Sequence, residues 1–547
     1  MRSVVFTLLI LTLFNNIWPA QNSESICPTV DVGYATYLGN RTYSNTVAYL
    51  GIPYAEPPVG DLRFRATVPL NTTRVSEEAN LNGDAVINAT YYPDFCIQGT
   101  TGAGDAGGAG SEDCLNVNIY SPYDAQEGDN LPVLFYIHGG GYIFGNPRNW
   151  PFDNWVYQSP NVIIVSVYYR LDSFGFLATP EFANSTYGDF NAGFKDQIQA
   201  LKWVKSYISK FGGDPTKVTI NGQSAGGSSV ELHMIANEGE QLFSGAIAQS
   251  VFRTPLPTPE QQRPLFQFYA SYAGCGTGSV AEQMACLRGA SVSALARAQD
   301  AAAQGKFSGL YNLFRPVLDG VLITGYPTLK FQRDEFAHVP LIVGATSNET
   351  LSGGTNISLA LQEFFPSLTD ADIQEFLLLY PVDEFDSLSQ QFQVATGEPE
   401  LICGRQAMSG PSSLYSNTWT YRYNTPNPTS GSDLVSHAAE NWMMFDGTNT
   451  GFNGSTTFTP QTPAELAFAS ELIAYWLSFV RAGNPNTYKL DKSPVWEQYT
   501  ESNPMRMVLM QDPQNLTNVS GSYMEGQPVA EAARCAFAIS KVKACEN

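Results

Sequence analysis

The chain has 547 residues, 43% of them hydrophobic, and a formal net charge of −22 at pH 7. This length allows a large core, and no Pro/Ser-rich linker or charge block divides the sequence, so we expect one large domain with elaborated loops. The acidic balance excludes partners that require a basic face, namely nucleic acid and anionic membrane surfaces.

The first residues are typical of a secretory signal peptide. Arg2 precedes a short apolar run, Val4 to Phe14, which is too short to span a bilayer. Pro19-Ala20, a few residues later, is a plausible cleavage site. No later segment has the length and hydropathy of a membrane helix, and the C-terminus carries no retrieval signal. We therefore expect a signal peptide at 1–20 and a secreted, soluble domain at 21–547, located outside the cell.

Cysteines and glycosylation sequons agree with this compartment. The sequence has 8 cysteines and no Cys-x-x-Cys pair, which favours structural disulfides over metal or redox sites. If the chain is secreted, we expect several of its Asn-x-Ser/Thr sequons to carry glycan. They lie at Asn40, Asn71, Asn88, Asn184, Asn348, Asn356, Asn453, Asn515 and Asn518.

The first part of the chain contains strands, turns and a glycine-rich loop. Residues 36–64 are strand-like and then rich in proline and glycine. Between Cys96 and Cys114, residues 102–107 match a dinucleotide-binding fingerprint. No strand precedes this match and no helix follows it, so we interpret the segment as a mobile surface loop.

A buried strand is predicted at residues 132–137, and His138-Gly139-Gly140-Gly141 follows it directly. Without Cβ atoms, the backbone amides of such a triplet can turn toward one point, as an oxyanion hole requires. A simple glycine-rich turn is the alternative interpretation.

Strands and helices then alternate, which favours a mostly parallel α/β sheet. The pattern predicts a strand at 162–168, a helix at 196–210, a strand ending at 218–221 and a helix at 228–236.

Between the last two elements lies Gly222-Gln223-Ser224-Ala225-Gly226. A serine among small residues, between strand and helix, occupies a tight turn that exposes its Oγ at a helix N-terminus. A chance Gly/Ser-rich turn is the alternative, but the flanking strand and helix favour a nucleophile.

Further strands are predicted at 246–248, 341–344 and 419–423, and a short helical segment between Cys275 and Cys286. A long amphipathic helix is predicted at 464–482, because Gly483-Asn484-Pro485-Asn486 is a strong stop signal.

A nucleophilic serine needs a base, and the chain has only 4 histidines. In folds with this turn, the acid and then the histidine follow the serine along the chain. His138 precedes the serine, His233 lies on the helix after it and should point away, and His338 precedes the strand that would deliver the acid. His437 remains as the candidate base.

The acid should follow a strand end and precede His437. Glu349 lies a few residues after the strand at 341–344, although position alone leaves other acidic residues open. If Glu349 is buried against His437, the neighbouring sequon Asn348 should be empty.

Several motifs in one order resemble type-B carboxylesterases of the cholinesterase/lipase family, including secreted fungal-type members, over nearly the whole mature chain. The motifs are Gly51-Ile52-Pro53-Tyr54-Ala55, Pro57-Pro58-Val59-Gly60, Ser111-Glu112-Asp113-Cys114-Leu115-Asn116-Val117-Asn118, His138 to Gly141, Tyr169-Arg170-Leu171, Phe211 to Gly226, Pro316-Val317-Leu318-Asp319-Gly320 and Gly483 to Asn486.

The resemblance implies the α/β-hydrolase fold, with a large central sheet flanked by helices, and a triad of Ser224, Glu349 and His437. It implies oxyanion donors at Gly140, Gly141 and Ala225, an acidic residue at Glu440, and no metal or organic cofactor. It also implies the disulfides Cys96–Cys114 and Cys275–Cys286. For the four remaining cysteines we expect Cys535–Cys545 and Cys27–Cys403.

Two departures narrow the substrate. Gln223 stands where cholinesterases carry glutamate, and the first disulfide loop has no tryptophan to stack on a quaternary ammonium. That loop is short and polar, unlike the amphipathic lid of related fungal lipases.

The sequence therefore predicts a serine carboxylic-ester hydrolase for short or modest-sized esters. A lipase or sterol esterase with a long acyl tunnel and a non-catalytic binding protein of this fold are the alternatives. The natural acid and alcohol, the oligomeric state and glycan occupancy stay open.

Overall fold

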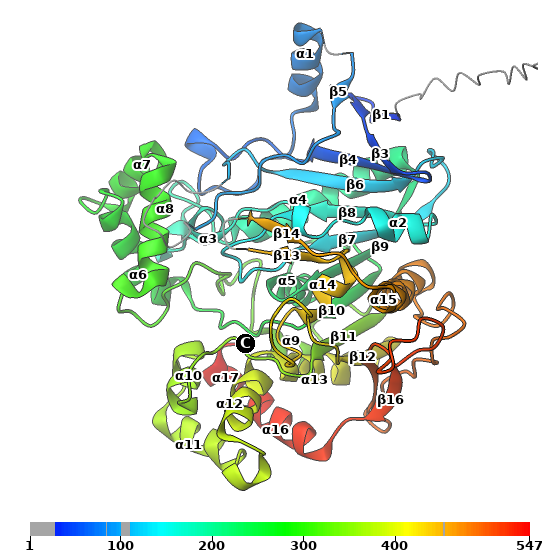
Figure 1. Ribbon diagram of the computed structural model, residues 1–547. Coiled ribbons are helices and arrows are strands. Elements are labelled where there is room, and N and C mark those ends of the chain that lie inside the picture. Colours follow the sequence, from blue (N-terminus) through cyan, green and yellow to red (C-terminus); the bar gives the residue numbers. More distant parts are fainter. Residues whose placement is uncertain (1–27, 84, 100–109, 452–453) are drawn as a thin grey trace, which may run out of the picture.

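The fold was analysed in a computed structural model, which describes residues 28–83, 85–99, 110–451 and 454–547 (Figure 1). The predicted signal peptide, Cys27, the fingerprint match at 102–107 and the sequon Asn453 lie outside the described residues.

An 11-stranded sheet, in the order β16-β15-β12-β11-β10-β9-β7-β8-β6-β4-β3, runs through the molecule. All neighbouring pairs from β15 to β8 are parallel, and the pairs at both ends of this order are antiparallel. β1, β2 and β5 form a small second sheet, and β13 pairs with β14. The strands are β1 (Thr29–Asp31), β2 (Thr36–Leu38), β3 (Asn40–Tyr43), β4 (Thr46–Pro53), β5 (Ile87–Asn88), β6 (Asn116–Pro122), β7 (Leu131–Ile137), β8 (Ile163–Val167), β9 (Gly213–Gln223), β10 (Gly245–Gln249), β11 (Leu341–Thr346), β12 (Thr418–Tyr423), β13 (Thr448–Thr450), β14 (Thr456–Phe458), β15 (Met505–Leu509) and β16 (Tyr523–Gly526).

Helices cover both faces of the large sheet, and α10, α11 and α12 gather with the C-terminal helices α16 and α17 at one end (Figure 1). The α-helices are α1 (Thr72–Asn82), α2 (Asp153–Gln158), α3 (Asp172–Phe176), α4 (Ala192–Tyr207), α5 (Ala225–Ile235), α6 (Pro259–Tyr272), α7 (Val280–Gly289), α8 (Val292–Ala301), α9 (Pro327–Gln332), α10 (Ile357–Phe364), α11 (Asp370–Leu378), α12 (Leu388–Gly397), α13 (Cys403–Ser412), α14 (Ala439–Met444), α15 (Pro463–Ala482), α16 (Val529–Ser540) and α17 (Val542–Cys545). Among the described residues, no helix is both long and apolar enough to cross a membrane.

The central strands are apolar on both faces because both faces are covered. In β7, Val133 and Phe135 pack into the cluster that contains α4 and α5, whereas Leu134 and Tyr136 pack into the cluster with α2, α14 and α15. This two-sided burial explains why the strands appear in the sequence as continuous apolar runs rather than alternating ones. The predicted parallel α/β sheet is confirmed.

Of two helices predicted from the sequence, one starts earlier than predicted and the other is confirmed. The predicted helix at 228–236 begins earlier, at Ala225, directly after the serine. The helix at 464–482 is confirmed as α15, which begins after a capping box formed by Thr462 and Glu465 and ends at Gly483 in the left-handed conformation.

The described residues contain three disulfides, and both pairings expected for the last four cysteines are wrong. Cys96–Cys114 and Cys275–Cys286 are bonded as the resemblance implies. Cys403, however, is bonded to Cys535, and Cys545 is a buried thiol with no disulfide partner among the described cysteines. The reason is tertiary: Cys403 begins α13, which packs against α16 where Cys535 lies, so neither Cys27 nor Cys545 is its partner.

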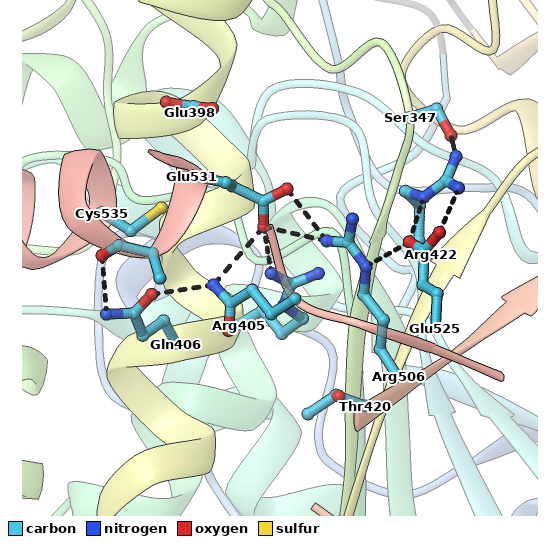
Figure 2. Close-up of polar contacts among 12 residues, drawn as sticks. Ser347, Glu398, Arg405, Gln406, Thr420, Arg422, Arg506, Glu525, Glu531 and Cys535 are labelled. Carbon is cyan, nitrogen blue, oxygen red and sulfur yellow. Dashed lines mark hydrogen bonds and ion pairs between the residues drawn. The ribbon is translucent and has the colours of Figure 1, made fainter. Parts of the chain in front are cut away.

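Near this disulfide an ion network connects the C-terminal segment to the rest of the sheet (Figure 2). Glu531 of α16 pairs with Arg405 and Arg506, and Glu525 of β16 pairs with Arg506 and Arg422. Its last link is the Nη1 of Arg422, which donates to the Oγ of Ser347 at 2.8 Å. Ser347 lies two residues before Glu349, so the network reaches the loop that carries the candidate acid.

Candidate active site

Neighbouring parallel strands end at one edge of the sheet, and the predicted site residues follow those ends. The carboxyl ends of parallel strands meet on the same side of a sheet, where α/β proteins build their sites. The strands concerned are β7, which ends at Ile137, β9 at Gln223, β10 at Gln249, β11 at Thr346 and β12 at Tyr423.

Ser224 occupies a strained turn between β9 and α5. Its φ is 59° and its ψ is −124°, a conformation that non-glycine residues rarely adopt. Its amide donates to the carbonyl of Gln249 at 2.9 Å, which fixes the turn against β10. Gly226 is required because a Cβ there would lie 2.0 Å from the carbonyl oxygen of Ile137. The turn thus places the serine hydroxyl at the start of α5.

Ser224, His437 and Glu349 form one hydrogen-bonded chain. The Oγ of Ser224 lies 2.8 Å from Nε2 of His437, and Nδ1 of His437 lies 2.7 Å from a carboxylate oxygen of Glu349. A carboxylate only accepts hydrogen bonds, so Nδ1 carries the proton and Nε2 accepts from the serine hydroxyl. The structure therefore brings together the three residues that the family resemblance implies as a triad.

The pKa values of the two ionisable members move in opposite directions. Burial alone would raise the pKa of Glu349, but the attraction of His437 and hydrogen bonds from His437, Ser250 and the Thr346 amide hold it below its usual value. Burial alone would lower the pKa of His437, yet Glu349 and other nearby carboxylates hold it above 6.5. The pair is arranged to favour a charged carboxylate beside an imidazolium.

Glu440 lies buried behind this chain. Among the described residues, neither of its carboxylate oxygens has a hydrogen-bond partner. Burial, followed by repulsion from Glu349, raises the pKa of Glu440 to about 7. It is thus a second carboxylate near His437 that titrates close to neutral pH.

The glycine turn after β7 lies beside Ser224. Gly140 has a φ of 111°, and a Cβ there would lie 2.0 Å from the carbonyl oxygen of Phe144, so only glycine fits. Within the described chain, the amides of Gly140, Gly141 and Ala225 donate no hydrogen bond to protein. Gly140, Gly141 and Ser224 line the same pocket, and free amides there are suited to a developing oxyanion.

Two buried side chains support this turn. His138 stacks on Tyr169 with ring centroids 4.4 Å apart, and its Nδ1 lies 2.8 Å from the carbonyl oxygen of Gly139. Gln98 accepts from the amide of Gly145 and donates to its carbonyl oxygen. Gln98 has no recognisable signal in the sequence, because its partner lies 47 positions away.

The other two histidines lie away from the hydroxyl. His233 is buried on α5, where Nδ1 contacts Glu238 and Nε2 contacts Gln197. His338 contacts Asp334 and stacks on Tyr415 at the surface.

Ser250 was not found from sequence. It follows β10, has a φ of 46°, and donates through Oγ to the Glu349 oxygen that does not contact His437. The sequence signal for Ser250 is weak, because it is only a polar residue after β10, the strand that pairs with β9.

The pocket over Ser224 has a volume of about 400 Å³. Aromatic side chains, glycine backbone and neutral amides and hydroxyls form most of its lining, with Arg315 and His437 as its ionisable groups. Gln223, a neutral amide beside the serine, accepts from Asn441 at 3.2 Å. No three or more His, Cys, Asp or Glu in the described ranges are grouped so as to hold a metal ion.

The chain is similar to known carboxylesterases and lipases. Residues 27–527 match the sequence model of the family described as "Carboxylesterase family". Carboxylesterase 1F of Mus musculus is 29% identical over 87% of this chain and 89% of that protein. Lipase 5 of Diutina rugosa is 35% identical over 66% of this chain and 71% of that protein.

The crystal structure of Aspergillus niger EstA superposes with a TM-score of 0.81 and 29% identity, covering 96% of this chain and all of that one. The predicted α/β-hydrolase fold and the resemblance to this family are confirmed.

Proposed function

The chain belongs to the carboxylesterase family and is a carboxylic ester hydrolase, and we propose that it works through an acyl-enzyme on Ser224. The observation that carries this proposal is the continuous chain from the Ser224 hydroxyl through His437 to Glu349, with contacts of 2.8 and 2.7 Å. Esters of small molecules are the substrates that follow from family and pocket.

In the proposed first step, the Oγ of Ser224 attacks the ester carbonyl carbon while Nε2 of His437 takes its proton. The carbonyl oxygen becomes an oxyanion, which the amides of Gly140, Gly141 and Ala225 stabilise, each by about 3 kcal/mol. Collapse of this intermediate breaks the bond to the alcohol, which leaves with the proton from His437.

In the second step, water attacks the acyl carbon, gives its proton to His437 and releases the acid, and Ser224 regains its proton. Glu349 keeps Nδ1 protonated throughout and stabilises the imidazolium, without itself taking a proton. Ser250 and the Thr346 amide hold the second oxygen of Glu349 and so fix its orientation.

We propose short or modest-sized esters as substrates. The pocket volume of about 400 Å³ lies near the lower end of the range for small-molecule sites. Its neutral polar lining, which includes Asn427, Asn441 and Thr448, also suits a soluble ester better than a long alkyl chain.

We further propose that residues 21–547 form the mature domain and that it is secreted and glycosylated. Three disulfides support an oxidising compartment. The sequons Asn40, Asn88, Asn184 and Asn518 are exposed. Asn348 is half-buried and its side-chain oxygen accepts from the Val435 amide, so we expect that sequon to be empty.

Hydrolysis of p-nitrophenyl esters from acetate to palmitate, by the wild type and Ser224→Ala, tests the function. We expect an inert variant and the highest kcat/KM with short chains. Long-chain preference with interfacial activation would favour a lipase, and a wild type that cleaves no ester would favour a binding protein. Full activity in Ser224→Ala would place the site elsewhere.

A further inference from the structure

The pocket over Ser224 contains one permanently charged side chain among its described lining residues, Arg315. The remaining lining is neutral apart from His437. A lone cation is unexpected in a chain with a net charge of −22.

The guanidinium of Arg315 lacks the partner that buried arginines usually have. Its Cζ lies 4.7 Å from the ring centroid of Phe252, its Nη1 donates to Thr254 Oγ1 at 3.2 Å, and its buried Nε has no hydrogen-bond partner among the described residues. No carboxylate of the described chain lies within 4.0 Å of it. Arg170, by contrast, is paired with Asp196 at 2.7 Å.

This environment leaves the charge of Arg315 poorly compensated. Burial lowers the pKa of its guanidinium to about 10, and the more distant Tyr142 and Asp172 offset burial only in part. The side chain is still protonated at neutral pH. A half-buried charge whose desolvation no carboxylate offsets is favourable for an incoming anion, and guanidinium geometry matches a carboxylate.

The position of Arg315 indicates which half of an ester it would contact. The leaving alcohol must lie beside His437, since Nε2 delivers its proton. Arg315 instead lies over the ring of Phe252, whose carbonyl accepts from Ser228 in the first turn of α5. Ala225, whose amide donates no hydrogen bond to the described protein, begins the same turn of α5, which places Arg315 toward the acyl side of the pocket.

We propose that Arg315 binds a carboxylate on the acyl part of the substrate, so that preferred substrates are half-esters of dicarboxylic acids. The inference rests on the proposed function and names its substrate class. Hydrolysis by water at Ser224 would release the alcohol and the dicarboxylate. Arg315 also lines a second cavity, of about 40 Å³, so the residue borders both cavities.

The test compares kcat/KM for monomethyl succinate, glutarate and adipate with that for methyl esters of uncharged acids of equal chain length. For the wild type we expect kcat/KM to be higher for the best half-ester than for the neutral ester of equal chain length. In Arg315→Gln the ratio of half-ester to neutral ester should fall on the order of tenfold or more, mostly through KM, because a charge-assisted hydrogen bond is lost. Arg315→Lys should keep part of the ratio.

Arg481→Gln is the matched control: Arg481 lies over the ring of Tyr488, as Arg315 lies over that of Phe252, but it is outside the pocket. The ratio of half-ester to neutral ester in this variant should stay at the wild-type value. Raising the salt concentration should lower the wild-type ratio but not that of Arg315→Gln.

A wild type that cleaves neutral esters without preferring any half-ester would overturn the inference while the proposed function stands. If Arg315→Gln and Arg315→Lys both lower kcat/KM equally for half-esters and neutral esters, Arg315 has a structural role, and the inference is overturned. If the wild type cleaves neither substrate, the proposed function itself fails.

Discussion

His437 has one carboxylate in contact and a second one nearby. Glu349 accepts from Nδ1 at 2.7 Å, whereas Glu440 lies three positions along the chain, buried and without a partner among the described residues. Both raise the pKa of His437, although only Glu349 orients the ring. Substitution of each carboxylate should therefore have a different result.

Glu349→Gln should lower kcat/KM on the order of 10³- to 10⁴-fold, because the amide no longer fixes the tautomer of His437. The base must be neutral to accept a proton, so activity is lost as pH falls through the pKa of His437. Removal of the carboxylate that raises this pKa should move the acid limb of the kcat/KM profile to lower pH. A limb that stays in place or moves to higher pH would contradict this electrostatic account.

Glu440→Gln should change stability in a pH-dependent way. The pKa of Glu440 is about 7 in the folded protein and roughly 4.3 in an unfolded chain. The folded state therefore binds this proton more tightly. The stabilisation of the folded state by protonated Glu440 is fully present below about pH 4 and is lost as pH rises to about 7. The free energy of unfolding therefore falls by roughly 3 to 4 kcal/mol over this range.

Since glutamine does not titrate, the stability of Glu440→Gln relative to the wild type should rise between pH 5 and pH 8, in steps that denaturant unfolding can resolve. A constant difference across these pH values would show that Glu440 titrates normally.

At the scale of single residues, the sequence can identify site residues whose order along the chain is set by the fold. The turn around Ser224 and the chain order selected Ser224 and His437, whereas Glu349 was one of several acids that position allowed and was implied by the family resemblance. Ser250, Gln98 and Arg315 were not identified, because their roles depend on partners 47 or more positions away and on burial, which a single sequence does not display.

Among the elements, the turn between β9 and α5 determines the geometry of the site. Gly226 packs against the end of β7, and Ser224 is bonded to the end of β10, so three parallel strands fix one hydroxyl. This dependence explains why the turn could be recognised from its small residues and flanking elements.

Gly226→Ala should reduce both activity and stability, the latter by about 1–3 kcal/mol, since its Cβ would meet the Ile137 oxygen at 2.0 Å. Gly289→Ala is the control, because a Cβ at this helix end meets nothing within 4 Å. Thermal unfolding and kcat/KM should separate the two variants, and equal behaviour would refute the packing argument.

Element types were predicted more reliably than element ends. The strands at 132–137, 162–168, 341–344 and 419–423 are present as β7, β8, β11 and β12, since continuous apolar runs indicate buried parallel strands. The start of α5 was missed by three residues because the helix begins within the glycine-rich turn, where composition disfavours a helix.

On the scale of the whole molecule, a disulfide and a network of ion pairs connect the C-terminal segment to the residues around the site. Cys535 of α16 is bonded to Cys403, and the network of Glu531, Arg506 and Glu525 continues to Arg422. Arg422 in turn bonds Ser347, in the loop of Glu349. The expected pairing of Cys535 with Cys545 was wrong because sequence spacing does not reveal which helices pack together.

Removal of this disulfide in Cys403→Ser/Cys535→Ser should lower the free energy of unfolding by about 3 to 5 kcal/mol, since the bond joins residues 132 positions apart. The double variant of Cys275 and Cys286, which are 11 positions apart, should lose less. Denaturant unfolding measures both, and a larger loss in the short loop would contradict the chain-entropy explanation.

The most direct test of the central claim is covalent labelling with a p-nitrophenyl alkylphosphonate, followed by peptide mass spectrometry. The phosphonyl group should replace the hydroxyl proton of Ser224, with one equivalent of p-nitrophenol released per chain. Labelling should be absent in Ser224→Ala and much slower in His437→Ala. A stable adduct on another residue, or no adduct in an active enzyme, would contradict the account.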